Sequence, residues 1–396
     1  MLNSITKQGF LLRMIYTLFF IQAGTWFSLF GLFLERTGLN GFESGIIMGI
    51  VPTVMLLVMP FWGMVADKLG HKNTLLITAL LTCFCFFLFI ANTGFWYFLI
   101  STVILSIVYN PTMNSLLDSI ALDYVDTHKT DNYGNFRIFG SIGYAVGGLL
   151  VGRLMTVYLT NPHDMKFIFI FASALLFVGW VLLFFLKQEH KLVKHEKESI
   201  FVGLKPIFKD KYIVGFLVLN TFVAVSIQSV WSYYTVYLNK IGASDQTVGI
   251  GIMIQALVEL PFYPIAYFII KKFGLVRAIS ISIFATAIRL FLYATVSHPT
   301  FALGIECLQG FSFILNLVAA IEYLNIAVPI RYRATGQALF AATYMGVGAI
   351  AGNWWAGYLV DAFGVQRMFL INAFVICLTF VYSFFIKNKQ YEHKKI

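Results

Sequence analysis

Long apolar runs dominate this chain and restrict the folds open to it. A helix of about 20 apolar residues crosses a bilayer, and twelve segments of that kind follow one another along the sequence. Only 12% of the 396 residues are charged, against about 25% in soluble proteins. We therefore predict an all-α membrane protein with twelve transmembrane helices. The expected spans are 11–34, 43–66, 74–93, 95–121, 135–159, 165–187, 212–238, 245–270, 276–296, 299–328, 334–359 and 367–386.

The lysines and arginines are distributed unevenly about these spans. With the N-terminus inside, inner segments hold 21 of the 28 Lys and Arg residues, and outer loops hold only Arg36, Lys166, Lys240 and Arg367. This positive-inside bias predicts a multi-pass cell-membrane protein with both termini in the cytoplasm. It also argues against nucleic-acid binding, despite the net charge of +10. No small-residue cleavage site follows the span at 11–34, so we expect it to be a retained helix and not a signal peptide.

The two halves of the chain repeat one design. A polar linker over 188–211 separates six expected spans, in residues 1–187, from six more, in residues 212–396. The pattern predicts two six-helix bundles related by a pseudo-twofold axis, the 6+6 arrangement of transporters whose halves rock about a site at the bilayer midplane. At an offset of 204 residues the matches are Leu34/Leu238, Gly38/Gly242, Gly45/Gly249, Pro60/Pro264, Gly70/Gly274 and Asp118/Glu322, and at 205 they are Gly143/Gly348, Gly147/Gly352 and Gly152/Gly357.

The stretch GMVADKLGHKNTL, residues 63–75, lies between the second and third spans. A glycine permits close helix contact, an aspartate can pair with a helix end or a base, and lysines face anionic head groups. We expect Gly63, Asp67, Gly70 and Lys72 to act as a conformational latch, with an ordinary polar turn as the alternative. The stretch resembles the signature loop of the major facilitator superfamily, and IIKKFGLVRA at 269–278 is a copy without the aspartate.

Ionisable residues inside the spans are candidates for function, because a charge buried in hydrocarbon costs several kcal/mol. Arg153 lies at a span end, where a side chain can snorkel to the interface. For the others, the alternative to a functional role is a structural ion pair between helices. These candidates are Asp118, Arg137, Glu259, Arg289, Glu306 and Glu322.

The segment YGNFRIFGSIG, residues 133–143, resembles the fifth-helix motif of the lactose-permease-like branch of the superfamily, which contains oligosaccharide, nucleoside and phenylpropionate proton symporters. The resemblance implies that Arg137 pairs with Asp118 and binds solute hydroxyls. It also implies that Tyr144 stacks on a sugar ring. Asp118 departs from the motif, since it is a shorter acid and its spacing to Arg137 differs by one residue.

Three segments of the second half also resemble this branch. VELP implies a helix-eight acid at Glu259, AIRLFLYA implies a helix-nine arginine at Arg289, and LQGFSF resembles a helix-ten motif. In that last motif Gln309 replaces the usual histidine, and Ser312 replaces the proton-carrying glutamate of the sugar symporters. A proton carrier must then be another acid, and the candidates are Glu259, Glu306 and Glu322.

Two candidate acid–arginine pairs, Asp118/Arg137 and Glu259/Arg289, could couple proton and solute movement. Burial favours the protonated form of a carboxylic acid, whereas a nearby arginine favours the ionised form. A conformational switch that moves the arginine therefore captures or releases a proton.

Polar and aromatic side chains on spans that line the cavity in this fold complete the expected substrate site. Asn110, Trp231 and Tyr234 offer amide groups, stacking faces and hydroxyls, and Gln228 is polar enough to join them. With Arg137, Asp118, Tyr144 and Gln309 they form the predicted solute-binding set. Helix packing is the alternative role for each aromatic residue.

The sequence contains no nucleotide-binding loop, nucleophile elbow or His/Cys cluster with metal spacing. We therefore expect no enzyme activity, no metal and no cofactor. The preferred function is proton-coupled symport of a small hydrophilic solute, a sugar or a nucleoside, by a monomer in the bilayer. The alternatives are a proton-coupled drug or metabolite exporter and, from another class, a non-transporting membrane sensor or lipid-handling protein.

Overall fold

The computed structural model describes residues 6–128, 132–158, 165–187 and 200–385, so residues 188–199 of the predicted linker lie outside the described residues. The described chain is helical, and no strand occurs within it. Its first half contains α1 (Lys7–Trp26), α2 (Phe30–Arg36), α3 (Gly41–Leu69), α4 (His71–Phe86), α5 (Leu88–Ala91), α6 (Phe95–Pro111), η1 (Thr112–Leu116), α7 (Leu117–His128), α8 (Tyr133–Tyr158) and α9 (Phe167–Phe185). Its second half contains α10 (Ile200–Lys209), α11 (Lys211–Lys240), α12 (Asp245–Phe273), α13 (Leu275–Thr295), α14 (Pro299–Ile305), η3 (Glu306–Leu308), η4 (Gly310–Ile314), α15 (Leu315–Ala327), η5 (Ile330–Tyr332), α16 (Arg333–Ala341), η6 (Ala342–Gly348), α17 (Ala349–Phe363) and α18 (Val365–Ser383).

Ten helical runs among the described residues are long and apolar enough to cross a membrane. The predicted all-α, multi-pass membrane protein is thereby confirmed. The fourth and eleventh predicted segments are also helical, but the π-helical turns η1 and η6 interrupt them. Neither segment is among the ten runs.

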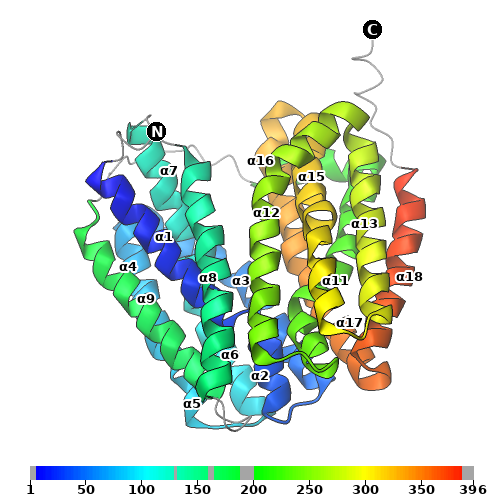
Figure 1. The fold of residues 1–396 in the computed structure, drawn as a ribbon. Coiled ribbons are helices and arrows are strands. Elements are labelled where there is room, and N and C mark those ends of the chain that lie inside the picture. The colour runs from blue at the N-terminus through cyan, green and yellow to red at the C-terminus, as the bar shows by residue number, and fades with distance from the viewer. Residues whose placement is uncertain (1–5, 129–131, 159–164, 188–199, 386–396) are drawn as a thin grey trace. The chain divides into compact units, whose positions relative to one another are not determined.

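The chain divides into two compact units. Unit 1 comprises Met1–Val193 and Leu238–Leu257, and unit 2 comprises Lys194–Tyr237 and Val258–Ile396. Within unit 1, α1 packs against both α8 and α9, and α3 packs against α6 (Figure 1). Within unit 2, α13 packs against α18 and α15. Each unit thus has its own helical core.

The sequence repeat recurs in the backbone at helix boundaries. Gly70 ends α3 with φ of 82°, and Gly274 ends α12 with φ of 86°. Gly38 and Gly242, the other matched glycines at turns, have φ of 91° and 81°. Glycine adopts this left-handed region without the steric cost that a Cβ brings, which explains why the repeat retains glycine at these four positions.

The glycine ladder of α8 and its copy in η6 and α17 allow close helix packing. A Cβ on Gly143 would lie 2.5 Å from the carbonyl oxygen of Thr17 in α1. In unit 2, a Cβ on Gly348 would lie 2.5 Å from the Cβ of Ala224, and one on Gly352 would lie 2.8 Å from the carbonyl oxygen of Val225, both in α11. Small residues bring these helix backbones together in each unit.

Candidate functional site

A buried ion pair forms the centre of the candidate site in unit 2. Arg289 of α13 and Glu306 of η3 approach to 2.7 Å between Nη2 and Oε2, and their side chains are only 1% and 0% exposed. Tyr293, one helical turn after Arg289, donates its hydroxyl hydrogen to Oε1 of Glu306 and accepts a hydrogen bond from Arg289 Nε at 3.2 Å. Both oxygens of the carboxylate are therefore occupied, as a buried charge requires.

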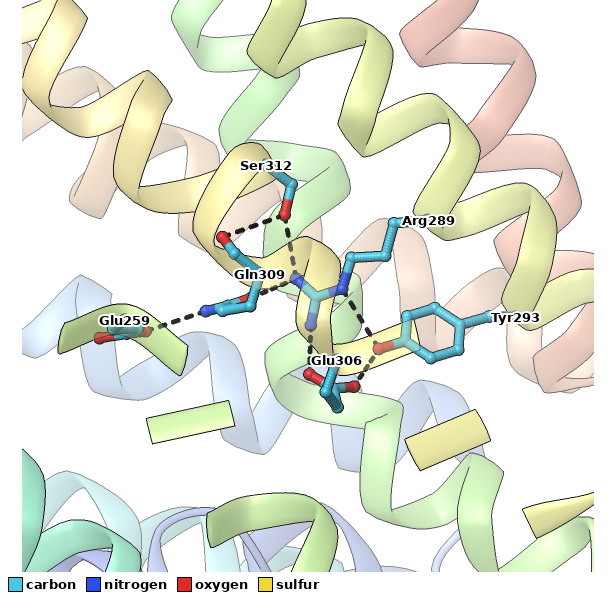
Figure 2. Close-up of polar contacts among 6 residues, drawn as sticks. All are labelled: Glu259, Arg289, Tyr293, Glu306, Gln309 and Ser312. Atoms are coloured by element: carbon cyan, nitrogen blue, oxygen red, sulfur yellow. Dashed lines mark hydrogen bonds and ion pairs between the residues drawn. The ribbon is translucent and has the colours of Figure 1, made fainter. Parts of the chain in front are cut away.

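Gln309 connects this pair to a second acid, as Figure 2 shows. Its Oε1 accepts a hydrogen bond from Arg289 Nη1, while its Nε2 donates to Oε1 of Glu259 at 3.0 Å. Ser312 accepts from the same Arg289 nitrogen at 3.3 Å. A continuous polar chain thus runs from the fully buried Glu306 to the half-buried Glu259 of α12.

The irregular backbone after α14 presents these side chains to Arg289. The α-helix ends at Ile305, a 3₁₀ turn carries Glu306, and the π-helical segment η4 carries Ser312. Such turns change the angular spacing of side chains and often occur at functional sites. This arrangement corrects the expected pairing of Glu259 with Arg289, since the ion pair in the structure joins Arg289 to Glu306.

Arg137 and Asp118 form a looser pair in unit 1. Arg137 Nη1 of α8 lies 3.8 Å from Asp118 Oδ1 of α7, and the two side chains are 45% and 24% exposed. Tyr16 of α1 donates a hydrogen bond to the same Asp118 oxygen at 2.7 Å. The Arg137 guanidinium also lies 5.1 Å from the ring centroid of Phe20, which stacks on Tyr16. The pair that the motif suggested is therefore present, with an accessible arginine.

The remaining predicted substrate residues are dispersed. The Tyr144 hydroxyl shares a hydrogen bond with Ser28, and Asn110 is buried and donates to the carbonyl oxygen of Val51 at 3.1 Å. Trp231 packs edge to face on Phe313, with ring centroids 4.9 Å apart. Tyr234 is buried with its ring against Tyr293. Asn110 thus joins α6 to α3, whereas both aromatic residues of α11 lie close to the Arg289 cluster.

The third acid considered as a proton carrier lies elsewhere. Glu322 is exposed on α15, while Glu306 is fully buried. The burial pattern therefore favours Glu306 and Glu259 over Glu322.

The predicted latch residues surround the turn between α3 and α4. Gly70 makes the turn, and Lys72 donates hydrogen bonds to the carbonyl oxygens of Phe184 and Leu186 at the end of α9. Asp67 is exposed near the end of α3. The expected close helix contact at Gly63 is wrong for the described residues, since a Cβ there would meet nothing within 4 Å. Lys72 therefore links the turn to α9 by capping a helix end, where a positive charge is favourable.

The sequence reasoning missed Tyr16 and Tyr293. The position of Tyr293, four residues after Arg289, places it on the same helix face and could have identified it. Tyr16 has no comparable signal, because it is one of 20 tyrosines in an aromatic-rich chain and its partner Asp118 is 102 residues away.

Comparison with known proteins places this geometry in a wider group. The model of the "MFS_1 like family" matches residues 10–371. The uncharacterized transporter YwbF of Bacillus subtilis (strain 168) is 28% identical over 395 residues, covering 97% of this chain and 95% of the relative. The maltose permease of Geobacillus stearothermophilus is 28% identical over 371 residues, covering 92% and 90%. The crystal structure of the nucleoside transporter NupG superposes with a TM-score of 0.84 at 20% identity, covering 97% of this chain and 100% of that one.

Proposed function

The chain belongs to the MFS_1-like family of membrane transporters, and from that premise we propose that it imports a small hydrophilic solute together with protons, by alternating access. It is a transporter and not an enzyme. Sugars and nucleosides are the proposed solutes. The names of the maltose permease and of NupG support this choice, as does the motif around Arg137.

The proposal includes a finer architecture. Twelve transmembrane helices form two bundles of six, in residues 1–187 and 212–396, with the linker 188–211 and both termini in the cytoplasm. The offset of 204 residues supports this division, because Gly38/Gly242 and Gly70/Gly274 share their left-handed backbone as well as their identity. The bias of lysine and arginine toward one side supports the orientation.

The single observation that carries proton coupling is the sealed Arg289–Glu306 pair. An ionised carboxylate in this position depends on its arginine, since breaking a buried pair costs about 3–5 kcal/mol. Protonation of Glu306 removes that charge and weakens its attraction for Arg289. We assign proton carriage to Glu306 and a connecting role to Gln309 and Glu259, whereas Arg137, which is exposed, meets the solute.

Uptake into proteoliposomes tests this function. The purified protein is reconstituted, and entry of labelled maltose and uridine is followed with the lumen alkaline and with no pH gradient. Faster initial entry of either solute with the alkaline lumen, abolished by a protonophore, is the expected result. If neither solute enters faster with the gradient, proton symport of these two solute classes is contradicted, and gradient-driven expulsion from the lumen would favour an exporter instead.

A further inference from the structure

A chain of side-chain hydrogen bonds joins α11 to α17 in unit 2, apart from the Arg289 cluster. Gln228 Nε2 donates to Ser232 Oγ at 3.1 Å, and Ser232 Oγ donates to Asn353 Oδ1 at 2.5 Å. Asn353 Nδ2 then donates to the backbone carbonyl oxygen of Ala349 at 2.9 Å. Ser232 and Asn353 are buried, whereas Gln228 is half-buried. The chain therefore runs from the interior to an accessible amide.

The direction of every bond in this chain follows from its buried end. The Ala349 carbonyl can only accept, so Asn353 must turn its NH₂ group to Ala349 and its oxygen to Ser232. The Ser232 hydroxyl has one hydrogen, which it gives to Asn353, so toward Gln228 it can only accept. Gln228 must consequently turn its NH₂ group to Ser232, and its carbonyl oxygen points away.

Glycine allows the two helices to come close enough for this chain. A Cβ on Gly352, the residue before Asn353, would lie 2.8 Å from the Cβ of Gln228. Real Cβ atoms do not approach so closely without a shift, so a larger residue at position 352 would push α17 off α11. Gly352 is a member of the repeated glycine ladder, which here brings Asn353 within reach of Ser232.

The amide oxygen of Gln228 is available to a ligand. It accepts no hydrogen bond among the described residues, and it is not one of their buried polar atoms without a partner. Trp231, three residues later on the same helix face, packs on Phe313, the neighbour of Ser312 in the Arg289 cluster. An amide oxygen turned to hydrocarbon would lose its hydrogen bonds at a cost, so this face is one that water or solute reaches.

We infer that Ser232 and Asn353 are positioning residues that fix Gln228 as a hydrogen-bond acceptor for a hydroxyl or N–H group of the transported solute. This inference rests on the proposed function and deepens it by assigning a polarity to one solute contact. A solute analogue in which fluorine replaces the contacted hydroxyl keeps its size but cannot donate. Without Ser232 or Asn353 the amide can rotate and present either end, so the preference for a donor disappears.

Competition for uptake tests the role in recognition. Entry of labelled maltose or uridine is measured in the presence of unlabelled competitor, which is either the parent solute or one of its monofluoro-deoxy analogues. The measured quantity is the ratio of the inhibition constant of an analogue to that of the parent solute. For the wild type this ratio should be about 5 to 10 for at least one analogue, the equivalent of one net hydrogen bond. Ser232→Ala and Asn353→Ala should reduce that ratio to about 2-fold or less while keeping most of the maximal rate. Ser232→Thr, which retains the hydroxyl, should behave as the wild type.

Ser229→Ala is the matched control, since Ser229 is a buried serine of α11 whose hydroxyl bonds within its own helix, to the Ser226 carbonyl oxygen. It should leave the ratio unchanged. If Asn353→Ala and Ser232→Ala lower only the maximal rate or the amount of folded protein, with the ratio retained, the positioning role is contradicted and these residues only hold the helices together.

A second measurement needs no solute. Melting temperatures of Gln228→Ala, Asn353→Ala and the double variant should be non-additive, and the non-additivity should vanish in a Ser232→Ala background, because coupling passes through that hydroxyl. Additive losses of melting temperature in the wild-type background would contradict the series of hydrogen bonds from Gln228 through Ser232 to Asn353. A wild type that moves neither maltose nor uridine contradicts the proposed function instead, so the two failures are distinguishable.

Discussion

Arg289 and Glu306 pair at 2.7 Å with side chains that are almost fully buried, whereas Arg137 and Asp118 are 3.8 Å apart and partly exposed. Among the candidate site residues, each unit thus contributes one acid–arginine pair, but the two pairs differ in distance and burial. The attraction within a fully buried pair changes strongly when the acid is protonated, because few other groups solvate its charges. An accessible arginine can exchange its weak partner for a solute hydroxyl. The division of roles between proton and solute follows from this difference.

Replacement of Arg137 by alanine should reduce uptake strongly with little change in stability. Its pair with Asp118 is long and exposed, and such pairs contribute about 0–1 kcal/mol. Loss of a charged hydrogen bond to the solute costs about 1.5–3 kcal/mol, so uptake at low solute concentration should fall about 10- to 100-fold. Initial uptake rates and thermal melting of the same preparation check both halves of this prediction. Uptake at the wild-type rate would remove Arg137 from the site.

Replacement of Arg289 by alanine should destabilise the protein strongly. It leaves the Glu306 carboxylate buried without its guanidinium partner, at a cost of about 3–5 kcal/mol. The double variant R289M/E306M should regain most of this loss, because apolar side chains of similar volume often replace a buried ion pair at no cost. Melting in one detergent compares the three proteins. A double variant as unstable as R289A would show that the pair is not the source of the effect.

Alanine at Gly70 and at Gly63 should have opposite outcomes. Gly70 has φ of 82°, a region that costs a residue with a Cβ about 1–2 kcal/mol. Gly63 lies inside α3, toward its C-terminal end, with open space at its Cβ position, so alanine there should gain up to about 1 kcal/mol in helix propensity. Melting temperatures of G70A and G63A measure this. Equal losses would contradict the placement of the turn.

The glycine ladder of α8 offers a similar comparison. Alanine at Gly143 would press its Cβ against the Thr17 carbonyl oxygen at 2.5 Å, and overpacking of this kind costs about 1–3 kcal/mol. Gly304 of α14 has nothing within 4 Å of its Cβ position, so G304A is the matched control and should be neutral or stabilising. Stability of G143A equal to that of G304A would contradict the close packing of α8 on α1.

Much of this fold could be predicted from the sequence, because a helix that crosses a bilayer requires a long apolar segment, which is a local pattern. Long apolar runs predicted the helices. The glycines repeated at offsets of 204 and 205 coincide with the turns at Gly70 and Gly274 and with the close packing of α8 on α1. Glycine occupies both copies of these positions because few other residues can replace it where φ is positive or where two backbones touch.

The partners within the site were harder to predict. A charge inside an apolar span is costly, so the sequence alone made Arg289 and Glu306 candidate functional residues. Which acid meets Arg289 depends on the 3₁₀ and π-helical turns after Ile305, which change the side-chain direction in a way that helical periodicity does not anticipate. Tyr293 and Tyr16 complete the two clusters, but an aromatic residue is as common in packing as in a polar network.

The most direct test of the central claim is to measure solute and proton entry together in proteoliposomes containing the wild type, E306Q or E322Q. Glu322 is the matched control, because it is an exposed acid on α15. We predict that the wild type and E322Q move protons with the solute that they transport, whereas E306Q exchanges solute across the bilayer without proton entry and without acceleration by a pH gradient. Proton entry with solute in E306Q at the wild-type ratio would contradict the assignment of proton carriage to Glu306.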